Sequence, residues 1–414
     1  MDILIKGATI LSKLSDHHLQ KRDVLVSDGI IKAIGDNIKV ENVDLIEGNE
    51  LYCSIGLCDI GTHTGDPGFE HRETIQSLTA AALAGGFTAL AVFPNTKPIT
   101  QTKASISYLK DHPHKNGVEI FPIGALSKDT KGQDIGEYMD MKYAGIVAVS
   151  DGIVSIQDAG LLSRALQYSN TLCLPVMHQP NDAHLSNGGE MHEGIMSTSM
   201  GMKGIPEIAE LNMVQRDILL QQYNEGILIE HAISASESVS AIKQAKANGQ
   251  KLYSTVAYMN LLHTDEDLVD FDSNLKVSPV LRAEDDRKSL IAGLIDGSID
   301  AIISNHTPLD EEVKNLEFPY ATPGAIGLET CLPATIGALK THLPIEEIIY
   351  KMAERPREIL GIHIPVINEG EKANLCIFDL KCPWIYEAEQ VKSLSKNSPY
   401  LGATFDVKVL KTLV

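Results

Sequence analysis

Apolar and polar positions follow two different patterns along the chain, and the pattern changes near residue 54. Before it, short apolar stretches at 3–5, 23–26 and 30–34 are separated by turns, which predicts a small β unit without a helix. After it, apolar runs alternate with segments of helical period, such as Ile156–Ser169 and Ser234–Asn248. The runs lie at 54–60, 87–93, 118–125, 144–149, 172–177, 227–230, 252–257 and 299–303.

Eight strands that alternate with helices predict an α/β fold, most simply a (β/α)8 TIM barrel. A doubly wound open sheet shows a similar alternation and is the alternative. Several helical segments end at glycine, as at Gly85, Gly249 and Gly297, where a residue that tolerates positive φ is expected.

The last part of the chain returns to β character. We expect the helices to stop after residue 355, a strand over Glu371–Asp379, and further strands as far as Val414. Because β units stand at both ends of the barrel sequence, we expect the termini to meet in one small β-sandwich. The predicted domains are residues 1–53 and 361–414 for the sandwich and 54–360 for the barrel.

The charge and cysteine content narrow the class of protein. A formal net charge of −20 on 414 residues argues against nucleic acid and against an anionic membrane surface, since both attract positive charge. No apolar stretch approaches the roughly 18 residues of a membrane span. The six cysteines show neither CxxC nor another metal-type spacing, so we expect reduced, buried thiols in a cytoplasmic protein.

Side chains that bind metals follow several of the predicted strands. Three histidines and one aspartate stand at such positions: His63, Asp151, His178 and His231. A single histidine there is more often structural, but four such residues at one end of a parallel barrel predict a divalent metal site. Asn95 follows the second strand and Asn305-His306 the eighth. Gly61 shares a face with His63, so a histidine at 61 would have completed a metal-binding pair.

The segments GTHTGDPGFEHRETI at 61–75 and AALAGGFTALAVFPNTKPI at 81–99 resemble the signature of the dihydroorotases, in the amidohydrolase superfamily. The resemblance continues through SPVLR at 278–282, SNHTPL at 304–309, ATPGAIGLETCLP at 321–333, ERPREILGI at 354–362, EGEKANLCIFD at 369–379 and NSPYLG at 397–402. It implies a metal-dependent (β/α)8 barrel with a β-sandwich built from both termini. It also implies the reversible cyclisation of carbamoyl aspartate to dihydroorotate in pyrimidine biosynthesis.

The sequence departs from the family at three site positions. The family's strand-one His-x-His and the arginine that binds the substrate carboxylate match Gly61, His63 and Gly65. The strand-eight aspartate, a metal ligand and general acid–base, matches Asn305. Two ligands of the first metal are therefore missing, together with the substrate-binding arginine.

Other family positions are retained. The bridging ligand and the strand-five and strand-six histidines match Asp151, His178 and His231, which could hold one zinc ion at most. Among substrate contacts, the resemblance retains Asn95, Pro323 and Gly324, whereas the family's Pro-His-His-Leu after strand seven reads Tyr258-Met259-Asn260-Leu261.

These departures suggest an impaired enzyme. Asn305 has no carboxylate to move a proton, and such general acid–base help is worth roughly 10²–10⁴-fold in rate. A glycine at 65 loses a bidentate contact worth about 1.5–3 kcal/mol.

Three functions remain open on the sequence. The favoured one is a scaffold, because the chain resembles dihydroorotase relatives that lost their metal ligands and assemble with aspartate transcarbamoylase. The alternatives are an active zinc-dependent dihydroorotase or other cyclic-amide hydrolase that uses the remaining ligands, and a small-molecule binding protein. A homo-oligomer is expected, and His192 is expected at the surface.

Overall fold

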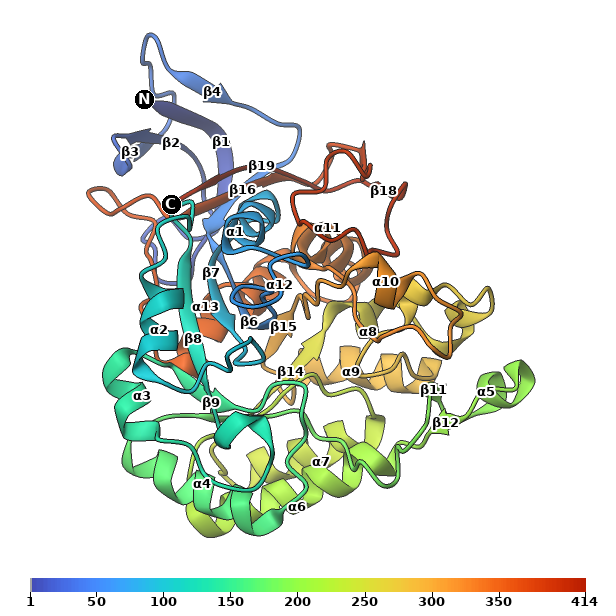
Figure 1. Ribbon diagram of the computed structural model, residues 1–414. Helices are drawn as coiled ribbons and strands as arrows, with labels where there is room; N and C mark the ends of the chain where they lie inside the picture. Colours follow the sequence, from blue (N-terminus) through green and yellow to red (C-terminus); the bar gives the residue numbers. More distant parts are fainter. Residues whose placement is uncertain (1) are drawn as a thin grey trace.

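A nearly closed barrel of eight parallel strands forms the centre of the computed structural model, which describes residues 2–414 (Figure 1). Neighbours in the barrel follow the order of the chain. The strands are β6 (Leu57–Thr62), β7 (Phe87–Val92), β8 (Glu119–Ala125), β9 (Ala148–Ser150), β10 (Val176–His178), β13 (Leu228–Glu230), β14 (Leu252–Ala257) and β15 (Ala301–Ile303). The predicted (β/α)8 barrel is confirmed.

Helices follow the strands, and most of them cover the outside of the barrel, whereas α5 lies on an arm that projects from it (Figure 1). They are α1 (Ile75–Ala84), α2 (Lys103–Lys110), α3 (Tyr138–Ala144), α4 (Ala159–Thr171), α5 (Ile195–Met200), α6 (Ile208–Asn224), α7 (Ser236–Ala247), α8 (Tyr258–Leu262), α9 (Glu284–Asp296), α10 (Glu311–Lys314), α11 (Leu328–Leu339), α12 (Ile345–Met352) and α13 (Glu354–Leu360). Capping residues such as Asp158, which accepts hydrogen bonds from the first turn of α4, set where these helices begin.

A buried carboxylate joins the first and last barrel strands. Asp59 in β6 accepts hydrogen bonds from Ser304 N at 2.7 Å and Ser304 Oγ at 2.6 Å, just after β15. His63 N donates to His306 O at 3.0 Å across the same seam. The residues that follow β6 and β15 are thereby held next to each other.

Both termini meet in a second sheet of seven strands, as expected. Its order is β19-β16-β5-β1-β2-β3, and β4 pairs with β1. The strands are β1 (Ile3–Leu11), β2 (Lys21–Ser27), β3 (Ile30–Gly35), β4 (Asp44–Ile46), β5 (Leu51–Ile55), β16 (Leu375–Asp379) and β19 (Lys408–Leu413), with β17 (Trp384–Ile385) and β18 (Thr404–Phe405) paired separately. The domain boundaries at 53 and 360 stay predictions.

Several element bounds differ from the sequence expectations. The apolar run 54–60 contains the end of β5 and the start of β6, which belong to different sheets. The run 144–149 begins on the last residue of α3, and the run 172–177 begins directly after α4, because hydrophobicity alone does not separate a buried helix end from a strand. The expectation that helices stop after residue 355 was wrong, since α13 continues to Leu360 and accommodates Pro356 in its first turn.

Two smaller expectations change as well. Gly85 has φ −89°, and the positive φ of 90° after α1 falls on Gly86. Four cysteines are buried, but Cys173 is exposed and Cys382 is partly exposed.

Within residues 2–414, no helix has both the length and the apolar character that crossing a membrane requires.

Candidate functional site: the mouth of the barrel

The four predicted ligand residues come from four strands of one parallel barrel and lie at its carboxyl end. His63 follows β6, Asp151 follows β9, His178 ends β10 and His231 follows β13. Phe93, just after β7, contacts two of them, with ring centroids 4.9 Å from His63 and 5.1 Å from His231. The sequence therefore predicted where these side chains gather, and the contacts below describe what each one does there.

The His231 ring occupies the space where a side chain at position 61 would stand. A Cβ added to Gly61 would lie 2.3 Å from His231 Cε1, and Gly61 itself has φ 103°. His231 Nδ1 is 3.2 Å from Thr255 Oγ1, whereas the buried Nε2 has no hydrogen-bond partner among the described residues. The His231 ring thus fills the space next to Gly61 that any side chain at this position would need.

Burial keeps the imidazole rings of His63 and His231 neutral. Burial, and then the neighbouring imidazole of His306, lowers the pKa of His63 to about 4. Burial, and then the imidazole of His63, lowers the pKa of His231 to about 3. At neutral pH neither ring carries a positive charge.

The carboxylate of Asp151 is enclosed by hydrogen-bond donors of the chain. It accepts from Ser127 N at 2.8 Å and from Ser127 Oγ. Burial raises the pKa of Asp151 to about 6, and the hydrogen bonds from Ser127 oppose this rise. Asn95 Nδ2 donates to Asp151 O at 3.0 Å, which holds the retained asparagine against the same loop.

Asn95 also explains the glycine that follows Asp151. A Cβ on Gly152 would lie 1.8 Å from Asn95 Oδ1, an atom that is buried and without a hydrogen-bond partner among residues 2–414. The glycine therefore allows the Asn95 side chain to approach the backbone. This contact is a packing requirement that the sequence does not reveal, since Asn95 was predicted only as a substrate contact.

His178 uses both ring nitrogens in contacts within the chain. Nδ1 lies 2.5 Å from Asp217 Oδ2, and Nε2 accepts from Ile156 N at 2.9 Å. The ring proton is therefore on Nδ1, and the carboxylate behind the ring fixes its orientation, as it does in many metal-binding histidines. The Nε2 lone pair that would bind a metal is already engaged.

A second buried carboxyl group lies behind the same ring. His178, Asp217 and Glu230 bring their ligand atoms within 4.8 Å of one another. Burial, and then the charge of Asp217, raises the pKa of Glu230 well above its usual range, and neither of its carboxyl oxygens has a hydrogen-bond partner in the described chain. Because Nδ1 already faces Asp217, Glu230 is best described as a protonated acid packed beside that pair.

Local structure also fixes two of the substituted positions, Asn305 and Gly65, and the segment that replaces the family's Pro-His-His-Leu. Asn305 Nδ2 donates to Ser278 O at 2.9 Å and so turns to the rim of the barrel. A Cβ on Gly65 would lie 2.3 Å from Phe69 O and 2.5 Å from Glu73 O. Tyr258–Leu262 forms α8, a mostly buried helix. None of these segments provides an anchor for a substrate carboxylate.

As they stand, the mouth residues do not fit the metal centre that the family resemblance implies. Asp151 and His178 Nε2 accept hydrogen bonds from backbone N–H groups, which a metal would have to displace. Within residues 2–414, Asp151, His178 and His231 do not form a group whose ligand atoms all lie within 4.8 Å of one another. No chemical step is therefore assigned to a metal in the mouth.

The retained Pro323-Gly324 lies at one side of the mouth. Gly324 N donates to Lys276 O at 2.8 Å. Pro323 is exposed and lines a cavity of about 380 Å³ together with Lys276, Ser278, Pro319 and Tyr320. None of the four predicted metal ligands lines this cavity.

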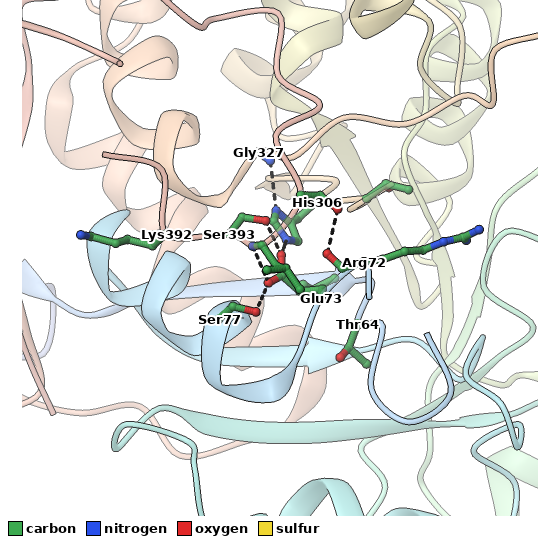
Figure 2. A network of polar contacts seen from close by, with 12 residues as sticks. Thr64, Arg72, Glu73, Ser77, His306, Gly327, Lys392 and Ser393 are labelled. Atoms are coloured by element: carbon green, nitrogen blue, oxygen red, sulfur yellow. Dashed lines mark hydrogen bonds and ion pairs between the residues drawn. The ribbon is translucent and has the colours of Figure 1, made fainter. Parts of the chain in front are cut away.

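A buried network around Glu73 was not recognised from the sequence (Figure 2). Glu73 accepts hydrogen bonds from Ser77 Oγ, Ser393 Oγ and Leu394 N, the last at 3.0 Å. His306 Nε2 lies 3.4 Å from Glu73 Oε2, while Gly327 N donates to His306 Nδ1 at 3.1 Å. The histidine after strand eight thus pairs with Glu73, and the same carboxylate ties the segment near Ser393 to the barrel.

Replacing Glu73 by alanine is expected to lower the free energy of unfolding by about 3–5 kcal/mol, because it leaves several buried donors unpaired. Urea unfolding measures this loss, and hydrogen exchange should rise in residues 391–398. The exposed Glu70→Ala is the matched control and should change stability by less than about 0.5 kcal/mol. Equal losses in the two variants would contradict the role assigned to the network.

Comparisons with known proteins agree with this architecture. Residues 53–249 match a family model described as dihydro-orotase-like. A dihydroorotase of Acetivibrio thermocellus is 39% identical over 417 residues, which cover 100% of this chain and 97% of the relative. A dihydroorotase of Caldicellulosiruptor saccharolyticus is 37% identical over 405 residues, which cover 97% of this chain and 94% of the relative.

Solved structures show the same fold. The L-hydantoinase (dihydropyrimidinase) from Arthrobacter aurescens matches with a TM-score of 0.84 and 24% identity, over 100% of this chain and 94% of that chain. Sequence identity to the two dihydroorotases over nearly the full length goes beyond fold. The chain belongs to the dihydroorotase family.

Proposed function

We propose that this chain is a dihydroorotase-family protein of pyrimidine biosynthesis with little or no hydrolase turnover, which serves as a noncatalytic partner of aspartate transcarbamoylase. The position of the His231 ring carries the proposal, because a side chain at Gly61 would meet it at 2.3 Å. The barrel has been repacked around the missing ligand. A site under selection for turnover would keep that space for a metal ligand.

The chemistry of cyclic-amide hydrolysis gives further support. The reaction needs an activated water and a proton for the leaving nitrogen. Asn305 stands at the family's acid–base position, and its amide donates to Ser278 O at 2.9 Å. Asp151, at the family's bridging position, is a retained carboxylate, but Ser127 donates two hydrogen bonds to it. Neither group is free to activate a water.

A second candidate is a cyclic-amide hydrolase with one metal. The paired contact of His178 Nδ1 with Asp217 favours it, because such a carboxylate orients a metal-binding imidazole. The unpartnered His231 Nε2 also favours it. This enzyme would have to break the hydrogen bond from Ile156 N to His178 Nε2 before a metal could bind.

Hydrolysis of dihydroorotate by the purified full chain, with and without added zinc, separates the two candidates. The Acetivibrio thermocellus dihydroorotase serves as the positive control. We expect a rate at least about 10²-fold below that of the control, since the acid–base group alone is worth roughly 10²–10⁴-fold. Turnover that depends on zinc and disappears in His178→Ala would overturn the proposal in favour of the second candidate.

The partner is tested separately. We expect the chain to co-elute in gel filtration with the aspartate transcarbamoylase of its own cell, and His178→Ala to co-elute equally well. Independent elution of the two proteins would contradict the scaffold role, whatever the hydrolysis assay gives.

A further inference from the structure

A second group of metal-binding side chains lies outside the barrel mouth. It comprises His192 in β11 (Met191–His192), Glu207 just before α6, and Asp286 in the first turn of α9. Their ligand atoms all lie within 4.8 Å of one another. Figure 1 shows β11 and β12 (Gly204–Ile205) beside the barrel near α9, at the base of the arm that carries α5. The expectation that His192 lies at the surface was wrong, since it is 5% exposed.

The His192 ring leaves one nitrogen directed into this group. Nε2 makes no hydrogen bond in the described chain, and Glu207 Oε1 lies 4.0 Å from it. A Cβ on Gly194 would still lie 3.5 Å from Nε2, so no side chain fills the space on that side. On the other side of the ring, Nδ1 is 3.4 Å from Arg282 Nη1, which is long for a hydrogen bond.

The carboxylates around His192 have few partners of their own. The hydrogen-bond donors to Asp286 come from Ser236, whose N–H donates at 2.7 Å, and Glu207 accepts none from the described residues. Asp265 carries a further negative charge close to His192, and its carboxyl group accepts a hydrogen bond from its own backbone N–H. None of the three carboxylates has a Lys or Arg within ion-pair distance among residues 2–414.

The nearby cation is engaged elsewhere. Arg282 Nε donates to Ser234 Oγ at 2.7 Å, and Arg282 Nη2 lies 3.5 Å from Glu210 Oε2. Burial, and then repulsion from Asp286, raises the pKa of Glu207. Burial also raises the pKa of Asp286, although the hydrogen bond from Ser236 N opposes it. The charge of Arg282 opposes both rises only in part, so it does not compensate the negative charge of the group.

We propose that His192 Nε2, Glu207 and Asp286 bind a divalent transition-metal ion such as zinc, which ties the segment carrying α5 to the barrel. One imidazole and two carboxylates are ordinary zinc ligands. Bonds of about 2.0–2.2 Å place ligand atoms about 3.4 Å apart, so the side chains must close by less than about 1.5 Å. Glu207 is partly exposed and gives both the freedom to move and a path from solvent. The site lies away from the mouth, so it does not depend on the proposed function.

Metal binding requires the His192 ring to carry its proton on Nδ1. Arg282 must then turn its Nη1 away from that atom, and Glu210, already 3.5 Å from Nη2, is the acceptor to which it turns. The ion would supply the positive charge that the three carboxylates lack.

Zinc binding by the metal-free full chain tests the site by isothermal titration, and cobalt(II) absorption gives a second readout. We expect one ion per chain in the wild type. Affinity should fall at least about 10-fold in Glu207→Gln and in Asp286→Asn. Asp286→Asn keeps an oxygen for Ser236 N, and circular dichroism verifies that both variants fold.

Two matched controls locate the ion. Glu193→Gln removes an exposed carboxylate next to His192, and His178→Ala removes a residue of the mouth; both should bind zinc as the wild type does. The proposal is overturned if the wild type takes up no zinc, or if Glu207→Gln and Asp286→Asn bind it unchanged. Loss of binding in His178→Ala alone would instead place the ion in the mouth and would also count against the proposed function.

Discussion

Arginine at position 65 is expected to destabilise this protein by about 3 kcal/mol without creating a site for a substrate carboxylate. The family residue no longer fits because a Cβ there would lie 2.3 Å from Phe69 O and 2.7 Å from Glu73 N. Both contacts are with backbone atoms, which cannot turn aside as a side chain can. Histidine at position 61 should be comparably destabilising, since its Cβ would meet the His231 ring and its φ of 103° disfavours any side chain.

Urea unfolding of Gly65→Arg and Gly61→His measures these losses. Gly337→Ala is the control, because nothing lies within 4 Å of its added Cβ and helix propensity favours alanine. The triple variant Gly61→His, Gly65→Arg, Asn305→Asp should not acquire dihydroorotate hydrolysis. Wild-type stability together with new hydrolysis in that variant would contradict the repacking of the mouth.

Acidification from pH 7 to pH 4 is expected to remove about 3 kcal/mol of stability through His231 alone. The pKa of His231 is lowered to about 3 in the fold, whereas a histidine in the unfolded chain has its ordinary pKa of 6.5. The stability from a neutral ring is thus present above pH 6.5 and is lost as the pH falls through this window. His63, whose pKa is lowered to about 4, adds a smaller loss because its pKa is shifted less than that of His231.

Urea unfolding at intervals between pH 8 and pH 4 checks this expectation. His231→Gln cannot take up the proton, so its stability should fall less steeply with acid, by about 3 kcal/mol over the range. The exposed His363→Gln is the control and should follow the wild type. Parallel curves for His231→Gln and the wild type would show that His231 is not held neutral in the fold.

The fold was largely predictable because a parallel barrel leaves a regular signal. Each buried strand is an apolar run, and each is followed by polar residues at the same end of the barrel. The predicted strand bounds were wrong where one apolar run contains parts of two strands. The run 54–60 spans the end of β5 and the start of β6, which are separated by Gly56. The expectation that helices stop after residue 355 also failed, because α13 continues to Leu360 with Pro356 in its first turn, where a missing N–H is tolerated.

The candidate site was predictable in position but not in its contacts. Strand ends locate Asp151, His178 and His231, but nothing in the spacing shows that the His231 ring fills the place of a side chain at 61. Asp217 and Glu73 lie in or just before helical segments, far in sequence from the histidines they pair with. Such partners depend on tertiary packing, and a single sequence carries no periodic signal for them.

The most direct test of a metal-free mouth is the position of zinc in crystals grown with the ion, located by anomalous scattering at the zinc edge. We expect a peak between His192, Glu207 and Asp286, and none between Asp151, His178 and His231. A peak in the mouth with bonds of about 2.0–2.2 Å to those three residues would contradict the repacked site and restore a metal-dependent hydrolase as the function.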